Sequence, residues 1–356
     1  MGMTIVNICS PTFDPCDSYG RIANELSFWL EAWGQQVNQI GDQARKQAIR
    51  PSLGGILLGY PTNFWTYGTF VNTGPRIAIT MFESTVLPDG WAEKLNRCDA
   101  VVVPSRFLMD VFRANGVTAP IRVIPLGISN AFHRAVSRGS STPFTFLAIA
   151  DRGRRKAWDK ATFAFDKAFG GDMNYRLILK ARQMPFRFTN PNIEVVSEDL
   201  TDGQLAQLYS ACHVMIFPSC GEGFGLPPRE FAATGGIALA TDWGGTADDL
   251  EHWGIPLPVV RMVDAWPDQK DWRGKLGQWA EVDTAALAET MKQVAAQYER
   301  MIAFRLRAAR FVWSHYHWAT FANRVNQLWD EILERKYGNH ADSHRDQPVA
   351  EAVGVR

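Results

Sequence analysis

The sequence predicts an α/β protein built from two Rossmann-like, doubly wound domains in tandem, which face each other across a cleft. Short apolar runs alternate with helical patterns along most of the chain, and the alternation restarts after the polar, turn-rich segment Arg134–Pro143. Strands that are apolar on both faces and separated by helices are typical of parallel sheets covered on both sides. With 356 residues, 46% of them hydrophobic, the chain can bury two cores of this kind.

The first domain is predicted to span residues 1–135. Its first helix, Gly20–Gly34, carries apolar residues at helical spacing and ends at a glycine. Ser105 is expected to cap a second helix that runs through Phe107 and Phe112. The expected strands are Thr4–Cys9, Gly55–Gly59, Arg76–Phe82, Ala100–Val103 and Ile121–Ile124.

The second domain is predicted to span residues 140–315. Its expected strands are Phe144–Ala150, Tyr175–Leu179, Ile193–Val196, Val214–Phe217 and Ile237–Ala240, with helices at Ala157–Phe169, Asp202–Ala211 and Pro228–Thr234. From Asp283 to Tyr337 the pattern is almost wholly helical and rich in aromatic residues, and residues 316–338 form its last helix. Residues 339–356 lack apolar periodicity and are expected to be a loose tail.

Charge and composition exclude several classes of protein. The 37 basic and 37 acidic residues give no net charge, so no global field attracts nucleic acid or anionic lipid. The five cysteines form no CxxC pair, and Cys9, Cys98 and Cys212 lie in or beside apolar runs, where a free cysteine behaves as a small hydrophobic residue. The odd count with that placement suggests a reducing compartment. The N-terminus does not read as a signal peptide, and no apolar run approaches the ~20 residues that span a bilayer. A cytoplasmic location is therefore expected.

The segment Val214–Asp242 is the most informative part of the sequence. A buried strand ends at Pro218, glycines follow at 221, 223 and 225, and two prolines then set the φ angles of a helix start. Ligands of open parallel sheets bind beyond the carboxyl ends of the strands, where this loop must lie. Glycines let a backbone approach a ligand closely, and helix N-terminal N–H groups favour a diphosphate. The spacing alone fits a ligand-binding loop and an ordinary strand-to-helix connection equally well.

The stretch GEGFGLPPREFAATGG resembles the signature of glycosyltransferase family 4, whose members are retaining enzymes of the GT-B fold. The segments CDAVVVPSRFLMDVFRANGV, ATDWGGTADDL and WSHYHWATFANRV are similar to other parts of that family, so the resemblance covers most of the chain. It implies that the last helix crosses back onto the first domain. It also implies that Glu222 contacts the transferred sugar and that Glu230 binds the ribose of the nucleotide. The backbone of four further residues would flank sugar and phosphates: Gly223, Phe224, Gly225 and Leu226.

The resemblance implies further site residues. In the family an arginine and a lysine after the first strand of the second domain neutralise the leaving diphosphate; here they are taken as Arg152 and Lys156, with Arg154 and Arg155 as alternatives. A solvated basic turn is the competing interpretation. Lys180 is a further candidate cation for the same cleft. Gly20 would belong to the family's glycine loop near donor phosphate and acceptor, with an ordinary strand-to-helix turn as the alternative. Glu83 stands where many members carry a cleft histidine.

Together these features imply a retaining transferase that moves a hexose-type sugar from a nucleotide-diphosphate sugar, UDP- or GDP-linked, to an acceptor hydroxyl. No metal is expected, since the leaving diphosphate would be neutralised by side chains. The acceptor stays open among a glycan, a lipid-linked sugar, a protein, a small molecule and a modified nucleobase, and peripheral membrane contact is an option. A nucleotide-sugar epimerase, a phosphorylase and a noncatalytic nucleotide-sugar-binding protein are the alternatives. A dehydrogenase is disfavoured because no G-x-G-x-x-G follows the first strand.

Overall fold

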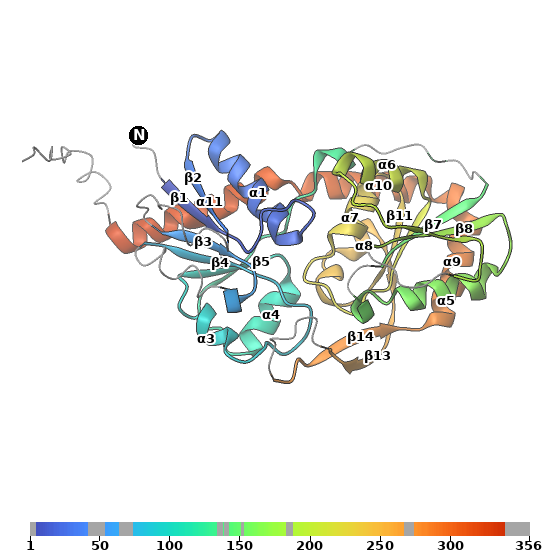
Figure 1. The fold of residues 1–356 in the computed structure, drawn as a ribbon, viewed down its shortest axis with the longest axis horizontal. Coiled ribbons are helices and arrows are strands. Elements are labelled where there is room, and N and C mark those ends of the chain that lie inside the picture. Colours follow the sequence, from blue (N-terminus) through green and yellow to red (C-terminus); the bar gives the residue numbers. More distant parts are fainter. Residues whose placement is uncertain are drawn as a thin grey trace, which may run out of the picture.

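The computed structural model describes residues 5–41, 54–63, 74–133, 138, 142–150, 153–182, 188–266 and 274–338. The chain forms two lobes, each built on a six-stranded parallel sheet (Figure 1). We call the lobe that holds strands β1–β6 the N-terminal lobe and the one that holds β7–β12 the C-terminal lobe. The predicted domain boundary at residues 135–140 falls almost wholly outside the described residues, and so does the predicted tail.

The N-terminal sheet has the strand order β2-β1-β3-β4-β5-β6. A strand forms within each of the five ranges predicted for this half, and most of the apolar side chains in these ranges are buried. The edge strand β2 was not predicted, since its sequence QVNQI is largely polar and its side chains are mostly half-buried or exposed. The strands are β1 (Ile5–Cys9), β2 (Gln36–Ile40), β3 (Gly55–Leu58), β4 (Arg76–Ile79), β5 (Ala100–Val103) and β6 (Ile121–Val123).

The C-terminal sheet has the order β9-β8-β7-β10-β11-β12, which is the doubly wound order of a dinucleotide-binding fold. The strand order reverses between β7 and β10, so the crevice beyond the carboxyl ends of these two strands is the expected ligand site. The strands are β7 (Phe144–Ile149), β8 (Tyr175–Lys180), β9 (Ile193–Val196), β10 (Val214–Phe217), β11 (Ile237–Thr241) and β12 (Ile255–Leu257).

Helices cover both faces of the sheets. In the C-terminal lobe α5 packs with α9, and α10 packs with α7 and α8. Ser105 caps α4 as predicted, accepting a hydrogen bond from the backbone N–H of Leu108. The helices are α1 (Ser18–Ala32), α3 (Trp91–Leu95), α4 (Arg106–Ala114), α5 (Trp158–Phe169), α6 (Asp202–Ala211), α7 (Leu226–Ala233), α8 (Leu250–Trp253), α9 (Thr284–Gln297), α10 (Ile302–His315) and α11 (Trp318–Tyr337). The short 3-10 helices are η2 (Pro61–Asn63), η3 (Asn130–Phe132), η4 (Gly153–Lys156), η5 (Gly244–Thr246) and η6 (Tyr298–Met301).

Helix α11 leaves the C-terminal lobe and packs against α1 of the N-terminal lobe, as predicted for the last helix (Figure 1). The chain therefore passes between the lobes twice, and the two passages touch. The Ile128 backbone N–H donates to the Tyr316 carbonyl at 3.0 Å. Gly127 lies so close to Trp318 that a Cβ added at residue 127 would come within 2.2 Å of the backbone nitrogen of Trp318. Only a glycine fits at this crossing.

An antiparallel hairpin, β13 (Val259–Asp264) and β14 (Gln278–Val282), extends from the C-terminal lobe beneath the N-terminal lobe (Figure 1). The Ser84 hydroxyl donates to the Leu276 carbonyl, and the Gln278 N–H donates to the Thr85 hydroxyl at 2.9 Å. The hairpin was not predicted, because both strands are partly exposed and carry charges. It gives the two lobes a second contact on the side away from the crossing chain.

Candidate active site

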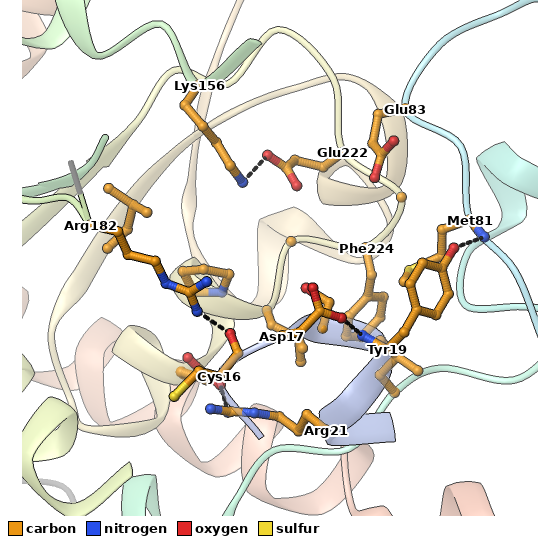
Figure 2. Close-up of a pocket in the computed structure, with 18 of the residues that line it drawn as sticks. Cys16, Asp17, Tyr19, Arg21, Met81, Glu83, Lys156, Arg182, Glu222 and Phe224 are labelled. Carbon is orange, nitrogen blue, oxygen red and sulfur yellow. Dashed lines mark hydrogen bonds and ion pairs between the residues drawn. The ribbon is translucent and has the colours of Figure 1, made fainter. Parts of the chain in front are cut away.

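A cavity of about 490 Å³ lies between the lobes and is lined from both of them. On the C-terminal side it is bounded by the ends of β7, β8 and β10, which is where the reversal of strand order predicts a ligand. On the N-terminal side it is bounded by the turn between β1 and α1 and by the segment after β4 (Figure 2). The site is thus assembled from residues that lie far apart in the sequence.

The glycine-rich loop runs from the end of β10 to the start of α7, as predicted. Gly225 has φ +82°, a left-handed conformation that most side chains disfavour, and prolines occupy the first turn of α7. A Cβ added at Gly221 would lie 2.2 Å from the Glu83 carbonyl oxygen of the opposite lobe. One at Gly245 would lie 2.1 Å from the Gly223 carbonyl oxygen. The glycines therefore allow close packing within the loop and across the cleft.

Arg229 stabilises this loop through hydrogen bonds to its backbone, and the sequence did not predict this role. Its side chain is fully buried and stacks on the ring of Phe224, with the guanidinium carbon 4.1 Å from the ring centre. Its Nη1 donates to the carbonyls of Phe224 and Gly225, and its Nη2 donates to those of Gly245 and Asp248 at 3.1 and 2.9 Å. One side chain thus fastens the glycine-rich loop to the segment around η5.

Glu222, at the centre of the loop, is nearly buried and is surrounded by cations. Its Oε1 lies 2.6 Å from Lys156 Nζ and 3.2 Å from Arg155 Nη1, and it accepts a hydrogen bond from the Ser219 hydroxyl at 2.5 Å. Burial raises the pKa of Glu222, but Lys156, Arg155 and the two hydrogen bonds outweigh burial, and the net pKa is lowered. Glu222 is therefore a carboxylate at neutral pH.

Lys156 reaches Glu222 from η4, directly after β7. Burial lowers the pKa of Lys156 and Arg155 lowers it further, whereas Glu222 raises it. Arg155 donates a second contact, from Nη1 to the Gly221 carbonyl at 2.6 Å. Of the alternatives that the sequence offered, Arg155 lines the cavity, whereas Arg154 is exposed and stacks on Trp266. Arg152 lies outside the described residues.

Glu230, on α7, is the second buried carboxylate of the cavity. Its Oε1 lies 3.0 Å from Nη1 of Arg21, which comes from α1 of the opposite lobe. Nη2 of the same arginine lies 2.7 Å from Oδ1 of Asp202 on α6. Burial raises the pKa of Glu230 to about 7; Asp202 raises it as well, whereas Arg21 and a hydrogen bond with Tyr209 lower it.

Lys180 closes the cavity from the end of β8. Its side chain is 9% exposed, and among the described residues it has no hydrogen-bond or ion-pair partner. A buried ammonium is unfavourable unless an anion pairs with it, and Lys180 lines the cavity, so this wall suits an anionic ligand. Arg182 lies beside it and donates to the Cys16 carbonyl, as Figure 2 shows.

The N-terminal wall is built from a turn and two strand ends. Asp17 caps α1 by accepting from the N–H groups of Tyr19 and Gly20. The Tyr19 hydroxyl accepts from the Met81 N–H at 3.0 Å, which fixes the segment that carries Glu83. In Figure 2 the Glu83 side chain points into the cavity from this wall.

The overall arrangement resembles that of solved glycosyltransferases and of a sucrose-phosphate synthase. Sucrose-phosphate synthase from Thermosynechococcus elongatus superposes with a TM-score of 0.74 at 15% identity, over 94% of this chain and all of that one. A glycosyltransferase from Rickettsia africae gives 0.71 at 13% identity, over 94% of this chain and 100% of that one. The glycosyltransferase WaaG, involved in lipopolysaccharide biosynthesis, gives 0.63 at 13% identity over 92% and 99%. No family model matches the sequence, and no curated protein matches it either.

The chain has the GT-B fold. In this fold the structure brings most of the sequence-predicted site residues to one cavity: Lys156, Lys180, Glu83, Glu222, Gly223, Phe224, Gly225, Leu226 and Glu230. Gly20 does not line the cavity; it sits in the first turn of α1, where an added Cβ would lie 2.1 Å from the Asp14 carbonyl oxygen. It therefore shapes the turn that lines the cavity. Arg21, Arg155 and Tyr209 also line the cavity, and Arg229 supports its glycine-rich loop; of these four, the sequence predicts only Arg155, as an alternative to Arg152.

Three other features of the described residues bear on function. They contain no group of three or more His, Cys, Asp or Glu side chains arranged to hold a metal ion. None of the helices in this part of the chain has the length and apolar character needed to cross a membrane. The five cysteines are free thiols, four of them buried, as expected for Cys9, Cys98 and Cys212 in apolar runs.

Proposed function

We propose that the chain is a retaining, metal-independent glycosyltransferase that moves a hexose-type sugar from a UDP- or GDP-sugar to an acceptor hydroxyl. The observation that carries this proposal is the buried cluster of Lys156, Arg155 and Glu222 at the point where the order of the C-terminal sheet reverses. The cluster offers cations to a diphosphate and a carboxylate to sugar hydroxyls within one cavity. The GT-B fold supports the proposal, since two of the neighbours described above are glycosyltransferases by name and the third is a sucrose-phosphate synthase.

In the proposed reaction Lys156 and Arg155 act on the leaving group. As the bond between the anomeric carbon and the diphosphate oxygen breaks, its electron pair moves to that oxygen, and fixed cations stabilise the developing charge. The acceptor oxygen forms the new bond on the same face of the sugar, and its proton passes to the leaving diphosphate. Lys180 is placed to share the phosphate charge.

The ion pair between Lys156 and Glu222 would be exchanged when the donor binds. The lysine turns toward the phosphates, and Glu222 accepts hydrogen bonds from hydroxyls of the transferred sugar. Glu230, one turn into α7, accepts hydrogen bonds from the ribose. The acceptor enters from the N-terminal wall, where Glu83 lies, and contact between the lobes excludes water from the reacting atoms.

The test is release of nucleoside diphosphate from a panel of UDP-, GDP- and ADP-sugars, with a chelator present. Release by wild type from one donor, lost in both Glu222→Ala and Lys156→Ala but kept in the surface variant Lys292→Ala, would support the proposal and name the donor. A donor bound without turnover, whatever acceptor is added, would favour a binding protein. Conversion of the donor sugar without transfer would favour an epimerase. If no nucleotide sugar binds, the proposal is wrong.

A further inference from the structure

Arg21, from the N-terminal lobe, forms ion pairs with two carboxylates of the C-terminal lobe: Glu230, which lines the cavity, and Asp202 at the start of α6. It reaches Glu230 and Asp202 at once, with its two terminal nitrogens 3.0 and 2.7 Å from their oxygens. Its side chain is 20% exposed, against 4% for Glu230 and 32% for Asp202. The contact thus joins one lobe to a carboxylate that the other lobe buries.

Both ends of this contact are held rigidly. Arg21 lies in the first turn of α1, which is capped by Asp17, and its Nε donates to the Pro15 carbonyl at 3.4 Å. Asp202 is the first residue of α6, whose start is fixed by a capping box between Thr201 and Gln204. The guanidinium is planar and offers several donors in a fixed geometry, so it can span two carboxylates without losing its own position.

The charges around Glu230 explain why it needs such a partner. The described groups that act on it are Arg21 from α1 and Asp202 and Tyr209 from α6, and Glu25 of α1 faces Arg21 and Asp202 in turn. Arg21 is the single cation in this set. Without it, a buried carboxyl beside Asp202 would take up a proton, because burial and like charge both disfavour the ionised form.

We propose that Arg21 is a positioning residue for the nucleotide: it crosses the cleft to hold Glu230 ionised and oriented toward the ribose, so that nucleotide affinity depends on contact between the lobes. The inference rests on the proposed function, since it takes the ribose of a nucleotide as the ligand of Glu230. Ribose hydroxyls donate more strongly to a carboxylate than to a neutral carboxyl. A carboxylate has about four acceptor positions, so about two remain for hydroxyls after the bonds from Arg21 and Tyr209.

A second ion pair between the lobes provides a matched control. Arg106 of α4 lies 2.7 Å from Asp249 of the C-terminal lobe, but its side chain is 64% exposed and it does not line the cavity. If Arg21 served only to hold the lobes together, loss of either arginine would have the same consequences. If Arg21 acts through Glu230, only its loss changes the pH dependence of nucleotide binding.

The experiment is calorimetric titration of the full chain with UDP and GDP at pH 6, 7, 8 and 9, for wild type, Arg21→Gln, Arg21→Lys, Arg106→Gln and Glu230→Gln. Wild-type affinity should fall about tenfold between pH 8 and pH 6, because only the ionised fraction of Glu230 is competent. Arg21→Gln should bind nucleotide about tenfold more weakly than wild type at pH 7. The midpoint of the pH dependence of its affinity should lie at higher pH than that of wild type. Arg21→Lys should restore part of the affinity and part of the shift. Arg106→Gln should keep the wild-type midpoint.

Titration of ¹³C-labelled glutamate carboxyls by NMR gives a readout that needs no ligand. A resonance with a midpoint near pH 7 should be absent from Glu230→Gln, unchanged in Arg106→Gln and moved upward in Arg21→Gln. If wild type binds nucleotide but the two arginine variants lose affinity alike at every pH, the role of Arg21 is refuted and the proposed function stands. If no nucleoside diphosphate binds wild type while the resonance still moves in Arg21→Gln, the proposed function fails and Arg21 is an interlobe contact alone.

Discussion

The two walls of the cavity are built in different ways. On the C-terminal wall, Glu222 and Glu230 are buried; Glu222 is paired with Lys156 of the same lobe and Glu230 with Arg21 of the opposite lobe, and Arg229 fastens the loop between the two glutamates. On the N-terminal wall, the turn after β1 is largely exposed at 14–16, and Glu83 is half-buried. That turn is held mainly by local hydrogen bonds between residues close in sequence. For example, the Asp14 N–H donates to the Thr12 hydroxyl, and the Cys16 N–H donates to the Asp14 carboxylate.

This contrast indicates that the C-terminal wall is the one suited to a ligand whose charge does not vary. Buried charges cost free energy unless they are paired, so a site that keeps several of them is preorganised for a ligand of fixed charge. An exposed turn can change in sequence and shape at little cost to the core. In the proposed function the first wall receives the nucleotide and diphosphate, and the second receives the acceptor.

The largest effect is expected from Lys156→Ala. If the C-terminal wall stabilises the leaving diphosphate, removal of this cation should lower turnover about 10³-fold, or about 4 kcal/mol of transition-state stabilisation. The measurement is the steady-state rate of nucleoside diphosphate release, with Lys292→Ala as the surface control. A loss of less than tenfold would show that the buried cluster is structural, and the contrast between the walls would lose its functional meaning.

The next largest effect is expected from Arg229→Ala, on stability. The substitution leaves buried carbonyls of two loops without a donor, each at a cost of about 1–3 kcal/mol, so a loss of about 3 kcal/mol or more in the free energy of unfolding is expected. Arg106→Ala removes an exposed ion pair and should cost about 1 kcal/mol or less. Chemical denaturation of both variants checks this. Equal losses would mean that the C-terminal wall is no more rigidly built than the surface.

Much of the fold could be predicted because its signals are local. The strands on either side of the glycine-rich loop are continuous apolar runs, and the two prolines after the loop mark the start of α7 wherever it lies in space. The glycine-rich loop and Lys156 could be placed in one cleft for the same reason, since both follow strands of one parallel sheet.

What could not be predicted depends on contacts between distant segments. Arg21 and Glu230 are 209 residues apart, and in sequence Arg21 is one more charged residue on an amphipathic helix. Arg229 stands between a proline and a glutamate in a helix start, where an exposed side chain would be the usual expectation. The strands β2 and β13 lie at sheet edges or in a hairpin, where polar residues are tolerated and the apolar pattern fades.

A smaller effect is expected from Gly20→Ala on the N-terminal wall. Alanine is favoured over glycine in a helix by about 1 kcal/mol, but here its Cβ would meet the Asp14 carbonyl oxygen and displace the turn, for a net loss of about 1–2 kcal/mol. A Cβ added at Gly203 of α6 would have no atom within 4 Å, so Gly203→Ala should be neutral or stabilising. Thermal unfolding of the pair checks this, and a gain in both would show that the turn moves freely.

The smallest effect is expected from Glu83→Gln on nucleotide affinity. The substitution keeps the shape of a half-buried side chain and removes its charge, and Glu83 belongs to the wall that the nucleotide is not expected to touch. The Kd for the nucleoside diphosphate should therefore change by less than about twofold, whereas Glu230→Gln should weaken binding about tenfold, as loss of a charge-assisted hydrogen bond implies. Calorimetric titration of the two variants at pH 8, where Glu230 is largely ionised, compares them under one condition. Comparable losses would mean that both walls contact the nucleotide, so that the division of the cavity between donor and acceptor would have to be drawn elsewhere.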